Sequence, residues 1–214
     1  MNEILKQSLG SETFVALDLE TTGVETKKSE ILEIAAIRFT ADKEIARFHS
    51  LTKPVRGLNY EAMKVNGITE EQLNHAPSLD SVLPEFLNFI SDSILIIQNA
   101  EFDLSFLLYE ARIRQISFPT LPVLCTVQLT RKLFPKIRHN LSSLRVEFGI
   151  LHEKNRSNVQ SKIHEAMDDS YAAMEVFKKC VLYSGGWKKS YLDIYHHEKG
   201  YKFTSDFEEE TLFT

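Results

Sequence analysis

Two kinds of pattern follow one another along this chain of 214 residues, and their order limits the folds that it can adopt. Three β-rich segments come first and indicate a three-stranded meander: residues 13–19, 31–40 and 45–52. Two short apolar strands, at residues 94–98 and 123–126, then alternate with segments of helical periodicity. The helical segments are residues 61–65, 70–73, 78–91, 102–113, 127–134, 141–148 and 165–183. This order predicts a mixed α/β sheet of five strands with helices on both faces.

The composition is typical of a soluble globular protein. Hydrophobic residues make up 43% of the chain, which is enough for a core, and no run approaches the roughly 18 apolar residues of a membrane span. The start of the chain is polar and contains no apolar signal segment, and its two cysteines are too few for a metal cluster. We therefore expect a cytoplasmic protein with reduced thiols and no membrane contact. The net charge of −5 argues against coating nucleic acid by charge alone but allows a local basic groove.

Two acidic residues stand on an apolar strand in the stretch FVALDLETTG, residues 14–23. Residues two positions apart on a strand face the same side, so Asp18 and Glu20 point together while Leu19 points away. The two acids could be solvated at an exposed strand end. However, a Thr-Thr-Gly turn follows the pair at once, and ligands gather at this position in open α/β sheets. The pattern therefore marks Asp18 and Glu20 as candidates for a functional site.

A third acid, Asp103, follows the strand at residues 94–98 in the stretch QNAEFDLSFL. It lies at the start of the next helix, where the helix dipole alone favours a negative charge. The residues by themselves therefore leave a structural role and a functional role open for Asp103.

The helix at residues 165–183 carries two neighbouring aspartates, and helical geometry separates them. Asp169 shares its face with an apolar stripe: Ala166, Ala173, Val176 and Cys180. Asp168 shares its face with residues that indicate a solvent-facing stripe: Ala172, Glu175 and Lys179. A carboxylate on the apolar stripe needs a partner, because burying an unpaired charge is prohibitive. We therefore predict a functional role for Asp169 and a surface position for Asp168.

Four inward acids need positive charge to share one pocket. Two unit charges 4 Å apart repel by about 4 kcal/mol at an effective dielectric of 20. Oxygen ligands suit Mg²⁺ or Mn²⁺ rather than zinc, and two such ions can clamp the attacking and leaving oxygens of a phosphoryl group. A lone histidine among carboxylates, such as His164, is better explained as a proton acceptor than as a ligand. His164 lies about 140° from Asp169 on a regular helix, so the two converge only if His164 belongs to the preceding loop.

The stretches DLETTG, NAEFD and HEAMDD, in this order, resemble the three exonuclease motifs of the DEDDh family of 3′–5′ exonucleases. This family includes the epsilon proofreading subunit of bacterial DNA polymerase III. The resemblance runs from about residue 12 to residue 183, through EAMKVNGIT, CTVQLTRKLFP and HNLSSLRVEFGI. It implies a ribonuclease-H-like fold in which His164 is the general base. It also implies four ligands for two divalent cations, Mg²⁺ or Mn²⁺: Asp18, Glu20, Asp103 and Asp169.

The resemblance also implies substrate contacts. Thr21 and Thr22 would lie near the sugar of the terminal nucleotide, and Phe102 would pack near the terminal residues. The chain departs from the family at Gln98 and at Asn66, which stand where or near where the family often has histidine. Neither position is a metal ligand, so we expect catalysis to survive and the departures to affect substrate binding.

Basic residues outnumber acidic ones between residues 126 and 162. They are Arg131, Lys132, Lys136, Arg138, Arg145, Lys154, Arg156 and Lys162, against Glu147 and Glu153. They could be a solvated basic face. The alternative is a track for backbone phosphates that leads to the site, because phosphate contacts supply affinity without reading sequence.

The chain becomes aromatic and charged after Gly185 and Gly186, so we divide it into an exonuclease domain, residues 1–184, and a C-terminal extension, residues 185–214. Trp187, Tyr191 and Tyr195 recur every four residues as an amphipathic stripe. This stripe would pack on the domain or dock on a DNA polymerase or other replication protein. The end, EEETLFT, slightly resembles a peptide that binds a sliding clamp.

Three functions remain open at this point. The first is a metal-dependent 3′–5′ exonuclease that releases nucleoside monophosphates from single-stranded 3′ ends of DNA, in proofreading or repair. The second is the same chemistry on RNA ends, where the 2′-hydroxyl would be the distinguishing group. The third is a nucleic-acid-binding module without hydrolysis, which the five filled catalytic positions disfavour.

Overall fold

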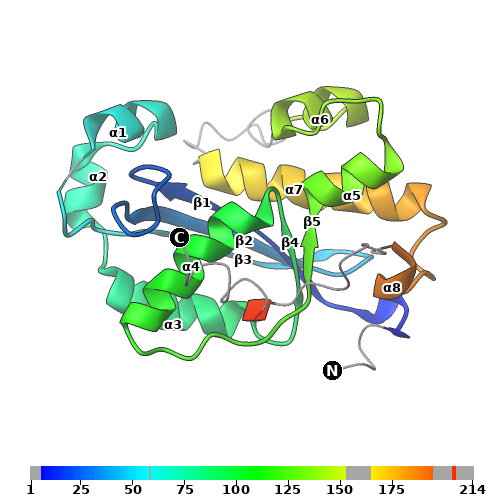
Figure 1. Ribbon diagram of the computed structural model, residues 1–214, viewed down its shortest axis with the longest axis horizontal. Helices are drawn as coiled ribbons and strands as arrows, with labels where there is room; N and C mark the ends of the chain where they lie inside the picture. Colours follow the sequence, from blue (N-terminus) through cyan, green and yellow to red (C-terminus); the bar gives the residue numbers. More distant parts are fainter. Residues whose placement is uncertain (1–5, 58, 153–164, 195–203, 206–214) are drawn as a thin grey trace.

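The computed structural model describes residues 6–57, 59–152, 165–194 and 204–205, and a mixed five-stranded sheet lies at its centre (Figure 1). The strands are β1 (Phe14–Thr21), β2 (Ile31–Phe39), β3 (Glu44–Leu51), β4 (Ile94–Ile97) and β5 (Val123–Cys125). Their order across the sheet is β3-β2-β1-β4-β5. The first three strands pair antiparallel, whereas β4 runs parallel to β1 and β5 runs parallel to β4. The predicted mixed sheet is therefore confirmed.

Helices cover both faces of this sheet (Figure 1). One face carries α3 (Leu79–Ile90) and α4 (Ala100–Ile113). The other carries α7 (Glu165–Tyr183), with α5 (Thr126–Leu133) and α6 (Leu141–Phe148) packed on its outer side. The shorter helices are α1 (Tyr60–Asn66), α2 (Glu70–His75), α8 (Tyr191–Ile194) and the 3-10 turn η2 (Leu9–Ser11). The predicted bounds of the strands and of the helices α1 to α7 agree with these to within about two residues.

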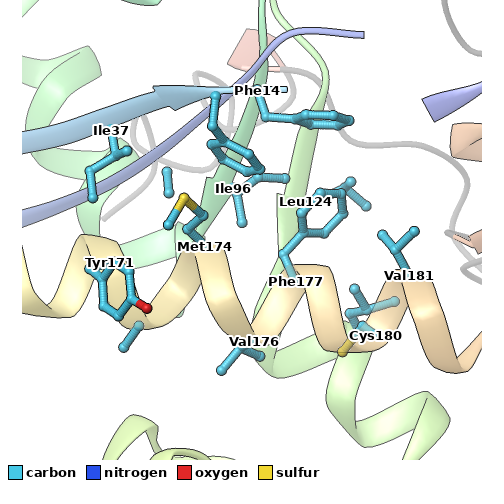
Figure 2. Close-up of a cluster of buried hydrophobic side chains, with 14 of the residues drawn as sticks. Phe14, Ile37, Ile96, Leu124, Tyr171, Met174, Val176, Phe177, Cys180 and Val181 are labelled. Carbon is cyan, nitrogen blue, oxygen red and sulfur yellow. The ribbon is translucent and has the colours of Figure 1, made fainter. Parts of the chain in front are cut away.

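The period of two along β1 divides the core into two layers. Phe14 and Ala16 belong to the cluster on the α7 face, whereas Val15 and Leu17 belong to the cluster on the α3 and α4 face. Figure 2 shows the α7 layer, where the rings of Phe14 and Phe177 have centroids 5.0 Å apart. Asp18 and Glu20 continue the even-numbered series, so β1 directs both acids toward the face that α7 covers.

The strand β4 is shorter than β1, and this difference leaves the carboxyl end of β1 without a β4 partner. The last β1–β4 pair is Leu17 with Ile97, so β1 continues for four residues without a partner on that side. The chain then turns at Asn99, which has a left-handed φ of 60°, and α4 begins at once. Asparagine tolerates this conformation better than most residues. The sharp turn brings the start of α4 to the end of β1 that has no β4 partner.

The first part of the C-terminal extension packs on the domain. The ring of Trp187 lies 5.9 Å from that of Phe14, and the hydroxyl of the buried Tyr191 donates to the backbone oxygen of Val123 at 2.7 Å. These contacts favour the packing interpretation for residues 187–194. Tyr195, the third aromatic residue of the stripe, lies outside the described residues, and the boundary at residue 185 stays a prediction. Within the described part of the chain, no helix combines the length and the apolar character that a membrane crossing requires.

Candidate active site

Asp103 is held against the free end of β1. The backbone N–H of Leu19 has no β4 partner at this point, and it donates to Oδ1 of Asp103 at 3.1 Å. The Asp103 side chain is buried, with a residue exposure of 2%. Burial raises the pKa of this carboxyl well above its ordinary value, although the hydrogen bonds from backbone N–H groups oppose the shift. The contact joins the second acidic motif to the first across 84 residues of sequence.

Asp18 lies at the centre of the acidic cluster. Its pKa is raised well above the ordinary value, first because of burial and then because of neighbouring negative charges. Those charges belong, in decreasing order of effect, to Asp103, Asp169, Glu20 and Glu33. The charged neighbours of Asp18 therefore include the other three acids that the sequence predicts as ligands. His164, the predicted general base, lies outside the described residues.

The start of α7 brings Asp169 to the same place. The hydroxyl of Ser170 donates to the backbone oxygen of Ala35 at 3.0 Å, and Ala35 is the β2 residue that pairs with Asp18. The other residues of the predicted apolar stripe on α7 are all buried, in agreement with the prediction. Burial raises the pKa of the Asp169 carboxyl, while hydrogen bonding and charge from Arg145 oppose the shift.

The predicted surface position of Asp168 is wrong. Its side chain is 13% exposed, whereas that of Asp169 is 42% exposed, and Ala172 on the predicted solvent stripe is fully buried. The reason is that α5 and α6 cover the side of α7 that faces away from the sheet, so α7 is buried on two sides. Asp168 instead pairs with Arg145 at 2.8 Å and with Nδ1 of His152 at 2.5 Å.

Glu33 is a fifth acid at the site, which the sequence reasoning missed. It pairs with Glu20 across β1 and β2, its side chain is fully buried, and its charge contributes to the raised pKa of Asp18. One carboxylate oxygen lies 2.7 Å from Nε2 of His49 on β3. A signal was present, because Glu33 interrupts the apolar stretch ILEIAAIRF, but only the strand register places it beside Glu20.

The chemistry of these side chains fits hard divalent cations. All donors are carboxylate oxygens, and the mutual repulsion that raises the pKa of Asp18 would be relieved by positive charge. Among the described residues, no three side chains of His, Cys, Asp or Glu stand close enough to count as a ready metal group. The described side chains therefore suit a divalent cation by their donor type and their charge, but they do not form a preformed cage.

Thr21, Thr22 and Asn66, three of the residues predicted to contact substrate, lie around the turn at the end of β1, whereas Phe102 lies on α4. Nδ2 of the buried Asn66 donates to the backbone oxygen of Thr21 at 3.3 Å. The Thr21 hydroxyl donates to the Gly23 oxygen at 2.7 Å, and the Thr22 hydroxyl accepts from the Glu30 N–H at 2.9 Å. Phe102 packs in the α4 layer, with its ring 5.2 Å from that of Phe106. These contacts hold the turn in shape, and the predicted substrate roles stay predictions.

Gln98, one of the two departures from the family pattern, links the end of β4 to the loop before α6. Its Nε2 donates to the backbone oxygen of His139 at 2.9 Å, and its Oε1 accepts from the hydroxyl of Thr126. This contact holds His139 beside the carboxyl end of β4. The exposed Lys136 and Arg138 come shortly before His139 in the sequence. Of the remaining predicted track, residues 154, 156 and 162 lie outside the described residues, and Arg145 is buried and does not belong to an exposed track.

Replacing Lys136 and Arg138 together with alanine should weaken binding of single-stranded DNA and flatten its salt dependence. Each lost phosphate contact lowers the slope of log K against log salt by about 0.7 for a single strand, so the pair should lower it by about 1.4. Fluorescence anisotropy across a salt series measures this slope. A matched control is Lys188→Ala with Lys189→Ala, two exposed lysines beside Trp187 at the opposite end of β1. An unchanged slope in the first variant would place the strand elsewhere.

Comparison with known proteins agrees with this geometry. The sequence model of a family described as "Exonuclease" matches residues 15–177. The DNA polymerase III subunit epsilon of Aquifex aeolicus is 33% identical over 177 residues, which cover 82% of this chain and 83% of that protein. A PolC-type DNA polymerase III of Thermotoga maritima is 33% identical over 175 residues. That match covers 81% of this chain and 12% of the polymerase, so the chain spans only a small part of that relative.

The fold also agrees with solved exonuclease structures. Exonuclease X, solved in complex with 5′ overhanging duplex DNA, has a TM-score of 0.60 and 24% sequence identity. The superposition covers 85% of this chain and 98% of that one. At this identity the likeness concerns the fold, which is the ribonuclease-H-like mixed sheet. By its sequence, the chain belongs to the exonuclease family, and it is similar to the epsilon subunit of DNA polymerase III.

Proposed function

We propose that this exonuclease removes nucleoside monophosphates from the 3′ ends of DNA by hydrolysis that depends on two divalent cations, Mg²⁺ or Mn²⁺. The observation that carries the proposal is the meeting of acids from three distant elements at the free end of β1. Such a concentration of negative charge destabilises the fold unless cations compensate it, so its presence argues for a functional use.

Each residue has a defined task in this proposal. Asp18, Glu20, Asp103 and Asp169 would hold the cations through carboxylate oxygens. Bound cations would supply Lewis-acid stabilisation of the phosphoryl oxygens. His164 would take the proton from the attacking water, because an imidazole with an ordinary pKa of about 6.5 is largely neutral at working pH. The Leu19 N–H would keep Asp103 oriented whether or not a cation is present.

The DNA substrate is proposed from the relatives, which are named as a PolC-type DNA polymerase III and a DNA polymerase III subunit epsilon. A role in proofreading or repair in the cytoplasm is part of the same proposal. Docking on a polymerase or a sliding clamp through residues 185–214 is part of the proposal. Because Trp187 and Tyr191 belong to the packed part of the extension, the test for docking is a pull-down with and without residues 206–214.

Digestion of end-labelled oligonucleotides tests the function directly. We expect shortening from the 3′ end of single-stranded and mispaired DNA in Mg²⁺ or Mn²⁺, with release of nucleoside monophosphates and no product in EDTA, because the acidic cluster then lacks its cations. Matched RNA oligonucleotides in the same assay compare the two substrates. Faster shortening of RNA would transfer the proposal to RNA ends. Binding without shortening under any of these metal conditions would support the binding module instead.

A further inference from the structure

Arg145 has an unusual environment for an arginine on a short helix. It lies in α6, yet its side chain is only 7% exposed. Arginine is almost never fully buried unless it is paired, because removing a guanidinium from water is costly. The groups that pair with Arg145 therefore indicate its role in the protein.

Within the described residues, the side-chain hydrogen bonds of Arg145 go to the start of α7. Its Nη2 donates to the backbone oxygen of Asp168 at 2.7 Å and to Oδ2 of Asp168 at 2.8 Å. The same nitrogen donates to Oδ1 of Asp169 at 2.9 Å. His152 holds Oδ2 of Asp168 from the other side, with Nδ1 at 2.5 Å. One buried cation thus ties together the two neighbouring aspartates, and a second group fixes Asp168.

Within the part of the chain that the structure describes, the guanidinium does not satisfy all of its own donors. Its Nη1 is buried and has no hydrogen-bond partner among the described residues. Buried polar groups are almost always paired, so this orphaned nitrogen is a cost of the arrangement. If the ion pair served only to join α6 to α7, Asp168 alone would be a sufficient partner for Arg145. The additional bond to Asp169 indicates a purpose at the acidic cluster.

We propose that Arg145 is a positioning residue that fixes the carboxylate of Asp169. The guanidinium is buried between α6 and α7, on the side of α7 away from the sheet. This inference rests on the function proposed above, in which Asp169 is a cation ligand. The Asp169 side chain is 42% exposed, so packing alone restrains it weakly. Arg145 engages Oδ1 and, within the described residues, leaves Oδ2 without a hydrogen bond. The orientation of Asp169 is therefore set before a cation arrives, which lowers the entropy lost on binding.

The test uses the full chain with Arg145→Met and Arg145→Lys, after circular dichroism and thermal unfolding have established folding. Mn²⁺ binding is measured by electron paramagnetic resonance, and oligonucleotide cleavage is measured across a Mg²⁺ series. We expect Arg145→Met to raise the Kd for Mn²⁺ and the Mg²⁺ concentration for half-maximal rate by about 10-fold to 100-fold, the range for residues that orient ligands. The KM for the oligonucleotide should change little. Arg145→Lys should recover part of the loss, because an ammonium group can still hold one oxygen.

The control is Arg114→Met on α4. Arg114 also bridges two acids, Glu110 and Asp80, but it lies at the end of α4 opposite to Asp103. This variant should lower thermal stability without moving the Kd for Mn²⁺. If Arg145→Met does not fold, Asp168→Asn, which loosens the anchor of Arg145 at constant volume, replaces it and should raise the Kd in the same direction.

The possible outcomes separate this inference from the proposed function. A wild-type Kd for Mn²⁺ in folded Arg145→Met or Asp168→Asn would make Arg145 a structural link only. Tighter Mn²⁺ binding would mean that Arg145 competes with cations, and it would also overturn the proposal. A wild-type protein that binds Mn²⁺ but cleaves no nucleic acid would sink the function while the positioning role stands on the binding data. Absence of Mn²⁺ binding in the wild type would sink both.

Discussion

Replacing Asp169 with alanine should lower the rate of Mg²⁺-dependent DNA degradation by about 10³-fold or more while the protein remains folded. Metal ions contribute several kcal/mol of transition-state stabilisation, and about 4 kcal/mol corresponds to 10³ in rate. Asp169 lies close enough for its charge to raise the pKa of Asp18, so its carboxylate belongs to the cluster. Single-turnover cleavage of an end-labelled strand, with enzyme in excess, measures the chemical step without product release.

The matched control for this variant is Glu175→Ala. Glu175 is an acid on the same helix, and it forms an ion pair with Lys178 at 3.0 Å. Its loss should leave the cleavage rate within about twofold of the wild type, because long-range charge effects at a surface are small. If Asp169→Ala cleaved at the wild-type rate in Mg²⁺, the acidic cluster would not be the catalytic centre. A binding module would show unchanged DNA affinity in both variants and no cleavage in any.

Local periodicity was sufficient to predict the frame of this fold. Period-two patterns and apolar runs predict the strands, and period-three and period-four patterns predict the helices. These elements appear in the predicted order. The pairing of Asp18 with Glu20 on one face needed only the geometry of a strand. Their meeting with Asp103 and Asp169 was predicted from motif order through the family resemblance, because no local rule connects residues so far apart.

Long-range packing decided what the sequence could not predict. The face of α7 that carries Asp168 looks solvent-facing by composition, but α5 and α6 cover it. Arg145 looks like one more basic residue of an exposed helix, and only the position of α6 against α7 turns it inward. Glu33 stands in an apolar strand, and only the register of β1 with β2 makes it a neighbour of Glu20. In each case the residue type was visible and its partner was not.

The second large effect expected concerns stability, and it has the opposite sign to a usual core substitution. Asp18→Asn should stabilise the metal-free protein by about 2 kcal/mol at a pH above the raised pKa of Asp18. Two unit charges 8 Å apart repel by about 2 kcal/mol at an effective dielectric of 20, and Asp18 faces four other acids. For a chain of this size the gain corresponds to a rise of about 4–8 °C in Tm. Thermal unfolding in EDTA measures it.

The direction of the pH dependence follows from the raised pKa of Asp18. The ordinary value is 3.8, and the folded protein holds the proton to higher pH than the unfolded chain does. The contribution of Asp18 to the stability of the wild type is therefore greatest below the ordinary value and falls as pH rises through the raised pKa, because the folded state binds more protons in that window. The asparagine does not titrate. The advantage of Asp18→Asn should consequently vanish in acid and grow to a plateau above the raised pKa.

Added Mg²⁺ should reverse the order of the two proteins. A ligand stabilises the folded state according to its affinity, so the wild type should gain more from Mg²⁺ than a variant that lacks one carboxylate. Asp42→Asn, at an exposed position in the turn between β2 and β3, should change neither the stability in EDTA nor the response to Mg²⁺. If Asp18→Asn were less stable than the wild type in EDTA at a pH above the raised pKa of Asp18, the acids would not repel one another in the folded protein. The electrostatic reason for a cation at this site would then be lost, because there would be no repulsion between the carboxylates for a cation to relieve.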